Sequence, residues 1–188
     1  MKNLCVAAVV MLGAGCHGGL DETFAAGNDN DVVYQTIVYT AADGSTQTRV
    51  LETNRAAQRS QLQRRAELGS HATSPITQAL IANDSPNCDG GDLWMFDQPA
   101  QNGNQLCIYV YRGSTTSLLS TFPRGLGQNW SGAVRSFWAG RDAGYFLFTP
   151  RQEYFAPNQL QNTADPLVQA ADRVHMYCTI PNGDLGCF

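Results

Sequence analysis

Basic residues are scarce in this chain of 188 residues, and lysine is almost absent. The chain has 12 Lys and Arg against 16 Asp and Glu, for a formal net charge of −4, and Lys2 is the only lysine. Nucleic-acid binding depends on a cationic surface that neutralises phosphates. We therefore expect no nucleic-acid partner.

Histidine and the common catalytic motifs are scarce as well. The three histidines stand alone in the sequence, and there is no G-x-S-x-G, H-E-x-x-H or phosphate-binding G-x-x-x-x-G-K-[ST] segment. His175 falls in an expected strand, where a structural role is favoured over that of a general base. Asp89, Asp92 and Asp97 surround another expected strand and are interpreted as solvated turn carboxylates. The sequence therefore predicts a protein that is not an enzyme.

The apolar run at the N-terminus, residues 4–12, is shorter than the roughly 20 residues that cross a bilayer. It follows a short positive segment that contains Lys2, and small residues come after it. This arrangement is typical of a cleaved export signal. We expect residues 1–15 to be a signal peptide.

The segment Leu12-Gly13-Ala14-Gly15-Cys16 resembles a bacterial lipobox, although its leucine stands four residues before the cysteine instead of three. The resemblance implies that Cys16 is diacylated and anchors the chain to a membrane of the bacterial cell envelope. Ordinary cleavage nearby, which would give a secreted protein, is the alternative.

Four cysteines remain after Cys5 and Cys16 are set aside: Cys88, Cys107, Cys178 and Cys187. An even number in an exported chain indicates two disulfides, and four cysteines allow three pairings. We favour the local pairs, Cys88 with Cys107 and Cys178 with Cys187. The sequence has no CxxC pair among them and no histidine at ligand spacing, so a zinc site is not supported.

The mature chain divides by composition into four parts. Residues 16–31 are small and polar and are expected to be a tether, and residues 32–69 combine a β-hairpin pattern with a helix. The arginines of that helix, Arg55, Arg59, Arg64 and Arg65, are interpreted as a solvated face instead of a basic patch. A linker at 70–87 then precedes a domain at 88–188.

Residues 88–188 contain several short, aromatic-rich strand patterns separated by turn residues. This pattern predicts an all-β domain, an antiparallel sandwich or Greek-key arrangement. Most of its aromatic residues are expected in the core, and an exposed platform for a carbohydrate or peptide is the alternative. The residues concerned are Trp94, Trp130, Trp138, Tyr109, Tyr111, Phe137 and Tyr145.

One stretch of this domain carries a family resemblance. Phe96 is followed after six residues by Gly103, and about 30 residues later comes Trp130-Ser-Gly-Ala-Val-Arg-Ser136-Phe. This resembles the β/γ-crystallin Greek-key motif. The resemblance implies that Phe96 packs on a folded hairpin, that Gly103 has a positive φ, and that Ser136 bonds back to the hairpin. A second, shorter copy follows from Tyr145, with Phe155 where a glycine is expected.

The resemblance also raises the question of calcium, which many microbial members of that family bind through two Asn or Asp, two variable residues, Ser or Thr, and Ser. The corresponding runs here are 131–136 and 171–176, which keep only Ser136 and Asp172 and place Arg135 at the fifth position. Calcium prefers several oxygen ligands, including carboxylates. We expect weak or no calcium binding, and no cofactor.

Together these features predict an exported, lipid-anchored crystallin-like module with a structural or binding role. Its partners would be the membrane and an extracellular protein or glycan. The alternative is a secreted protease inhibitor of the crystallin fold, because bacterial inhibitors with that fold and two disulfides exist. Such an inhibitor would present a rigid loop, at 88–92 or in the tail at 179–188.

Overall fold

The computed structural model describes residues 28–40, 45–68, 88, 92–109, 114–140 and 142–177. The expected signal peptide at 1–15, Cys16, the expected linker at 70–87, and Cys178 and Cys187 lie outside these residues. Most described residues belong to strands, so the prediction of an all-β domain is confirmed. No helix in this part of the chain is long and apolar enough to cross a membrane.

Within the residues that the structure describes, fifteen elements follow one another. They are β1 (Val32–Thr40), β2 (Thr46–Asn54), α1 (Arg55–Leu68), β3 (Leu93–Gln98), β4 (Asn102–Ile108), β5 (Ser114–Leu118), the 3₁₀ helix η4 (Leu119–Thr121), β6 (Pro123–Gly125), β7 (Gln128–Asn129), β8 (Ser136–Ala139), β9 (Ala143–Phe148), β10 (Arg151–Phe155), β11 (Leu160–Gln161), α3 (Pro166–Gln169) and β12 (Arg173–Tyr177).

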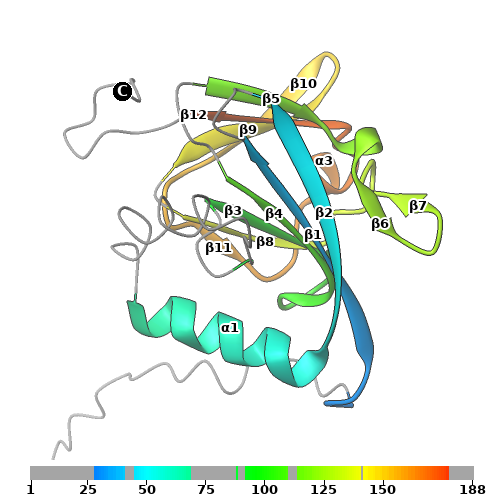
Figure 1. The fold of residues 1–188 in the computed structure, drawn as a ribbon. Helices are drawn as coiled ribbons and strands as arrows, with labels where there is room; N and C mark the ends of the chain where they lie inside the picture. The colour runs from blue at the N-terminus through cyan, green and yellow to red at the C-terminus, as the bar shows by residue number, and fades with distance from the viewer. Residues whose placement is uncertain are drawn as a thin grey trace, which may run out of the picture.

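The strands form two main sheets (Figure 1). Sheet A has six strands in the order β11-β8-β3-β4-β1-β2, and sheet B has four in the order β10-β9-β12-β5. Strands β6 and β7 form a separate two-stranded ribbon. Neighbouring strands pair antiparallel except β1 and β4, which run parallel.

The two sheets exchange strands. Among β3, β4, β5 and β8, only β5 lies in sheet B, while the other three are neighbours in sheet A. The following set, β9 to β12, mirrors this arrangement, because β11 alone lies in sheet A. Each set of four strands therefore gives its third strand to the sheet of the other set, and neither sheet is complete without both.

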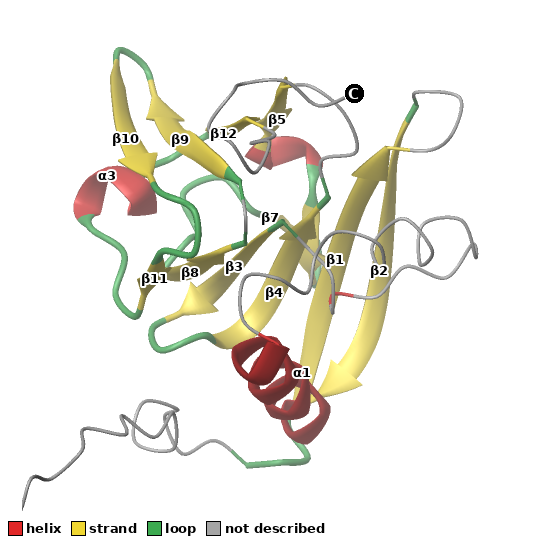
Figure 2. Cartoon of the chain, turned by 90° about the vertical axis from the view of Figure 1, so that its left-hand side faces the viewer, coloured by secondary structure: helices red, strands yellow, loops and turns green. Residues whose placement is uncertain are grey.

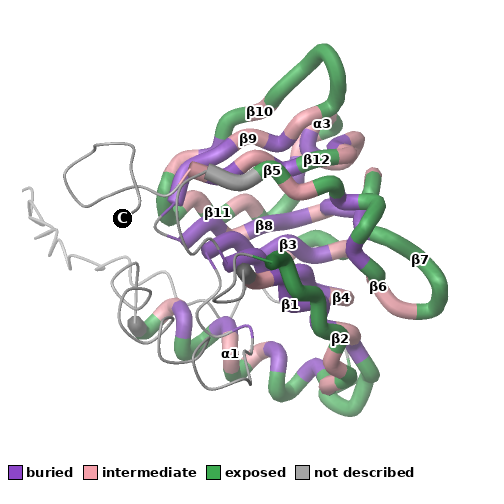
Figure 3. Tube along the Cα trace, turned by 45° about the horizontal axis from the view of Figure 1, so that its top comes forward, coloured by how far each residue is buried: buried purple, intermediate pink, exposed green. Residues whose placement is uncertain are grey.

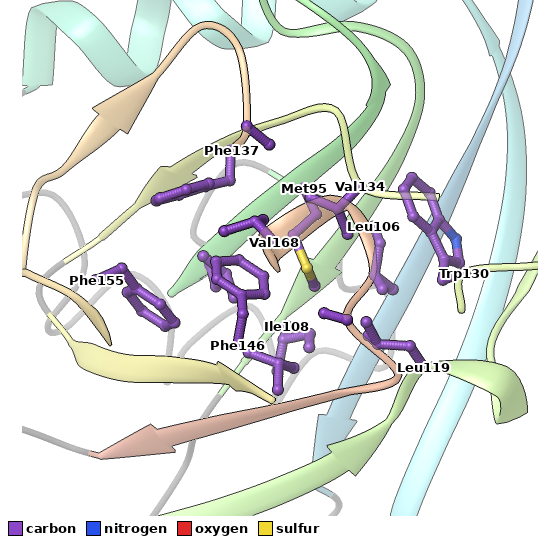
Figure 4. Close-up of a cluster of buried hydrophobic side chains, with 14 of the residues drawn as sticks. Met95, Leu106, Ile108, Leu119, Trp130, Val134, Phe137, Phe146, Phe155 and Val168 are labelled. Atoms are coloured by element: carbon purple, nitrogen blue, oxygen red, sulfur yellow. The ribbon is translucent and has the colours of Figure 1, made fainter. Parts of the chain in front are cut away.

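The space between the sheets is filled by apolar side chains from both of them (Figure 4). Met95 and Leu106 come from sheet A, while Phe146 and Phe155 come from sheet B. Phe146 and Phe155 also contact Phe137, with ring centroids 5.0 and 5.9 Å from it. The alternation of buried and outward residues along β9 and β12 follows from the two-residue period of a strand.

The predicted hairpin and helix are present as β1, β2 and α1. Asn54 caps α1, because its Oδ1 accepts a hydrogen bond from the backbone N–H of Ala57 at 2.9 Å. The hairpin joins sheet A through the parallel pairing of β1 with β4, and α1 crosses the face of sheet A that points away from sheet B (Figure 2). The sequence carried no local sign of this pairing.

The interpretation of the helix arginines as a solvated face is wrong for two of the four. Arg55 and Arg65 are buried, as are Gln58 and Leu62, whereas Arg64 is exposed. Buried and exposed positions alternate along α1 (Figure 3). The buried positions recur at intervals of three and four residues, which places them on one face of a helix. The buried face of α1 is therefore mainly polar.

Candidate functional site

A folded hairpin joins β3 to β4. Gly103 has a φ of +79°, which confirms the expected positive value, and Ala100 and Gln101 each have a φ of +54°. Ser136 lies across from this hairpin, where its Oγ donates to the carbonyl of Gln98 at 2.7 Å and accepts from the N–H of Gln101 at 3.0 Å. The expected hydrogen bonding of Ser136 to the hairpin is confirmed.

Asp97 closes the same hairpin. Its carboxylate accepts hydrogen bonds from the backbone N–H of Asn104 at 2.8 Å, from Asn104 Nδ2 at 2.9 Å and from Arg124 Nη1 at 2.8 Å. The prediction of a solvated turn carboxylate is therefore wrong for Asp97, because the backbone turn and Arg124 enclose it. It is also wrong for Asp92, which is fully buried. Asp89 lies outside the described residues.

Phe96 is fully buried on the α1 side of sheet A. Its cluster includes Ile37 of β1, Leu62 of α1 and the disulfide between Cys88 and Cys107. The predicted pairing of these two cysteines is confirmed. This disulfide fixes residue 88 to β4, beside the joint between β4 and β1.

The backbone around Arg135 and Asp172 is equivalent in the two sets of strands. The N–H of Arg135 donates to Phe96 O at 2.8 Å, and the N–H of Asp172 donates to Leu147 O at 3.0 Å. Asp172 is thus the counterpart of Arg135, which stands fifth in the run 131–136. The run 171–176, in which Asp172 stands second, is therefore the wrong segment to compare with 131–136.

The Arg135 guanidinium donates to the carbonyls of Gly132 and Val134, both at 3.1 Å. Within the described residues, no group of three or more His, Cys, Asp or Glu could hold a metal ion.

The outward face of sheet B carries a row of aromatic side chains that crosses three of its four strands and ends at Thr116 on the fourth, β5. Tyr154 of β10 pairs with Tyr145 of β9, Tyr145 pairs with His175 of β12, and His175 pairs with Thr116 of β5. The ring centroids of Tyr145 and Tyr154 are 5.5 Å apart, and those of Tyr145 and Tyr177 are 5.6 Å apart. We call Tyr145, Tyr154, His175, Tyr177 and Thr116 the aromatic row.

Tyr154 is the most accessible ring of the row, at 51% exposed, and Tyr145, His175 and Tyr177 are half-buried. The Nδ1 atom of His175 lies 2.5 Å from the Thr116 hydroxyl oxygen, and the ring of His175 stacks edge-on against Tyr177 at 4.6 Å. Desolvation raises the pKa of Tyr177. The charge of Tyr145 and the hydrogen bond between the two side chains raise it further. The rings therefore support one another as a fixed cluster that points into solvent.

Most of the aromatic residues that the sequence assigned to the core are buried. Trp94, Trp130, Tyr109 and Phe137 are buried, which confirms them as core residues. Trp138 and Tyr145 are only partly buried, and Tyr111 lies outside the described residues. The sequence singled out Tyr145 and considered His175, but Tyr154 and Tyr177 were missed because their register in the sheet determines that they meet.

A second polar feature lies beneath α1. The guanidinium carbon of Arg65 is 4.3 Å from the ring centroid of Trp94 and 5.3 Å from that of Trp138. Burial lowers the pKa of Arg65 to about 10, and the charges of Asp92 and Tyr109 oppose this lowering. Arg65 therefore remains a cation at neutral pH. It lies over two aromatic rings, whose faces attract a positive charge.

Comparison with known proteins gives no relative for this chain, because no family model, no curated protein and no solved structure matches it.

Proposed function

We propose that this chain is an exported, lipid-anchored and non-catalytic binding module of the β/γ-crystallin type, and that the aromatic row on sheet B is its binding surface. The ligand is an extracellular protein or a glycan. The observation that carries the proposal is the row itself: outward tyrosines and a histidine aligned across three neighbouring strands, with Thr116 of the fourth strand beside them.

Three structural details support the crystallin-type assignment. The two sets of four strands exchange their third strands, and in each set the fourth strand lies beside the first, as in a Greek key. Gly103 has the positive φ that the motif requires, and Ser136 hydrogen-bonds to the folded hairpin. These details occur at the positions that the sequence resemblance indicated.

The chemistry of the aromatic row supports a binding role. The outward faces of antiparallel sheets are commonly polar, so tyrosines collected on one of them require an explanation. Tyrosine offers a large contact area at a low entropic cost and a hydroxyl for hydrogen bonding, which is why it is enriched at binding surfaces. The mutual ring contacts of Tyr145, Tyr154 and Tyr177 lower that cost further, because the side chains are already ordered.

Three polar side chains of the described residues that could serve a reaction, Asp97, Ser136 and His175, are engaged in structure instead, which supports the absence of catalysis. Asp97 holds the folded hairpin together with Arg124, and the Ser136 hydroxyl both donates to and accepts from the hairpin backbone. His175 is hydrogen-bonded to Thr116.

Export is supported by the disulfide, since disulfides persist in oxidising compartments.

Binding is tested with a soluble Cys16→Ser form that lacks the lipid. Co-sedimentation with purified cell-wall glycan, chitin and cellulose is measured for this form and for Tyr154→Ala in the same background. Leu160→Ala is the matched control, because Leu160 is also exposed but lies on β11 of sheet A. We expect Tyr154→Ala to weaken binding at least tenfold, as loss of an aromatic anchor does, and Leu160→Ala to leave it unchanged.

If Tyr154→Ala binds as well as the Cys16→Ser protein that keeps Tyr154, the aromatic row is not the binding surface. A panel of secreted proteases, incubated with the same soluble form, tests the inhibitor alternative, and inhibition that survives Tyr154→Ala would favour it. Lipidation is tested separately: the full chain should partition with membranes, Cys16→Ser should not, and mass spectrometry of the N-terminal peptide should show the acyl groups.

A further inference from the structure

The outward face of sheet B carries almost no charge. Because side chains alternate along a strand, the register of the four strands determines which positions lie on this face. They are Gln152 and Tyr154 of β10, Ala143, Tyr145 and Leu147 of β9, Arg173, His175 and Tyr177 of β12, and Ser114, Thr116 and Leu118 of β5. Among these described positions Arg173 has the one permanent charge and none is acidic, although the chain has a formal net charge of −4.

Arg173 lies beside the aromatic row. It stands two residues before His175 on β12, a separation of about 7 Å along the strand, and its neighbours on the same face are Leu147 and Leu118. Its side chain is 49% exposed, and its Nε lies 3.9 Å from Asp172 Oδ2, which is beyond hydrogen-bonding distance. An exposed ion pair of this kind contributes little. The guanidinium is therefore available to an anion from solvent.

A carboxylate is the anion that suits this arginine. The planar guanidinium offers two parallel N–H donors that match the two oxygens of a carboxylate. The ligand must also suit the row, where Tyr145, Tyr154 and Thr116 carry hydroxyl groups and His175 carries ring nitrogens. A molecule that combines many hydroxyl groups with carboxylates meets both requirements.

The spacing of the row favours a polysaccharide over a protein segment. Neighbouring strands are about 4.8 Å apart, so the row offers one polar side chain at each step of that length, and the rings of Tyr145 and Tyr154 are 5.5 Å apart. One sugar unit of an extended polysaccharide has a similar length, and each unit would therefore meet one side chain of the row. An extended protein segment presents a side chain to one face only about every 7 Å and would not match these steps.

We infer that the ligand is an acidic polysaccharide, which lies along the aromatic row across the strands while Arg173 binds the carboxylate of one sugar unit. The row contacts the hydroxyl groups of the sugar chain. A carboxylate projects sideways from that chain and so reaches the neighbouring position of β12, where Arg173 stands. This inference rests on the proposed function, because it assigns the ligand chemistry of the same surface.

Polygalacturonate and its methyl ester are the probes, because they share one sugar backbone and differ in the charge of the carboxyl group. Affinity electrophoresis measures their binding to the soluble Cys16→Ser protein. We expect the acid form to bind about tenfold more tightly than the ester, as a charge-assisted hydrogen bond implies. Arg173→Gln should remove this difference, and Arg173→Lys should keep only part of it, because an ammonium group lacks the planar pair of donors.

Arg151→Gln is the matched control, because Arg151 is also exposed on sheet B, but its pairing with Phe148 places it on the other face. It should leave both affinities unchanged. Tyr154→Ala should weaken the acid and the ester by the same factor, since Tyr154 belongs to the row, whereas Arg173→Gln should weaken the acid alone.

The outcomes separate this inference from the proposed function. Equal binding of acid and ester that Tyr154→Ala still weakens would overturn the inference and leave the proposed function intact. Binding of neither polymer would also overturn the inference, and co-sedimentation with the other glycans then decides the proposed function by itself. Poly-glutamate represents an acidic protein. If it displaces polygalacturonate at an equal concentration of carboxylate, and Arg173→Gln abolishes this, the partner is an acidic protein and the assignment to a polysaccharide is wrong.

Discussion

Replacing Gly103 by alanine tests the folded hairpin most directly. The left-handed conformation that the φ of +79° requires costs a residue with a side chain about 1–2 kcal/mol of free energy. The added Cβ would also lie 2.0 Å from Asp97 Oδ1 and 2.8 Å from Gln98 Cγ. The Asp97 carboxylate cannot move without weakening its hydrogen bonds to Asn104 and Arg124, and bonds to charged groups contribute about 1.5–3 kcal/mol each. We expect Gly103→Ala to lower the free energy of unfolding by about 3–5 kcal/mol.

Gly127 supplies a matched control, because its φ is +74° but an added Cβ would meet nothing within 4 Å. Gly127→Ala should therefore cost only the backbone term, about 1–2 kcal/mol. Urea unfolding with the disulfide intact, followed by tryptophan fluorescence, measures both losses. In an Asp97→Ala background, the loss from Gly103→Ala should fall toward that of Gly127→Ala, and the remaining difference is the cost of the contact with Gln98 Cγ. Equal losses for the two glycine variants in the natural background would refute the reasoning.

Three further predictions concern other parts of the domain. Ser136→Ala leaves two backbone groups of the folded hairpin without a partner and should lower the free energy of unfolding by about 1–3 kcal/mol, whereas Ser131→Ala, at an exposed position, should change it little. Tyr145→Phe removes the hydroxyl that helps to raise the pKa of Tyr177, so this pKa should fall toward 10.0 when the phenolate absorbance is titrated. Because the raised pKa favours the protonated phenol, the stability it contributes is present below pH 10 and is lost as the pH rises through the pKa of the folded state. Replacing both cysteines of the described disulfide, which are 19 residues apart, by alanine should cost about 3 kcal/mol, and an unchanged urea midpoint would contradict this.

Local sequence signals predicted the elements whose residues alternate or repeat within one segment. The strands around Trp94 and Tyr145, the hairpin before α1 and the helix itself carry such patterns, and the disulfide joins cysteines that are near in sequence. The ribbon of β6 and β7 and the short β11 were missed because strands of two or three residues have no measurable period. Their pairing depends on the sheets that surround them.

The burial of Arg65 could not be predicted from charge alone. Its site is made by Trp94 and Trp138, which come from strands β3 and β8 and meet only through sheet register. The spacing of Arg55, Gln58, Leu62 and Arg65 was visible in the sequence, yet three polar residues out of four do not indicate a buried helix face. The same argument holds for the aromatic row, where the neighbours of Tyr145 are set by pairing across three strands.

The parallel pairing of β1 with β4 also determines the order in which this chain can fold. The hydrogen-bonded Gln35 and Gln105 are 70 residues apart, so β1 leaves the ribosome long before its neighbour exists. An isolated hairpin is only marginally stable, and β1 carries Ile37 and Val38, which are buried in the finished protein. The hairpin of β1 and β2 therefore lacks its second neighbour until β4 is made. Completing sheet A is consequently a late and slow step, since contacts between distant residues form slowly, and the β1–β2 hairpin is the segment that a chaperone would need to protect until then.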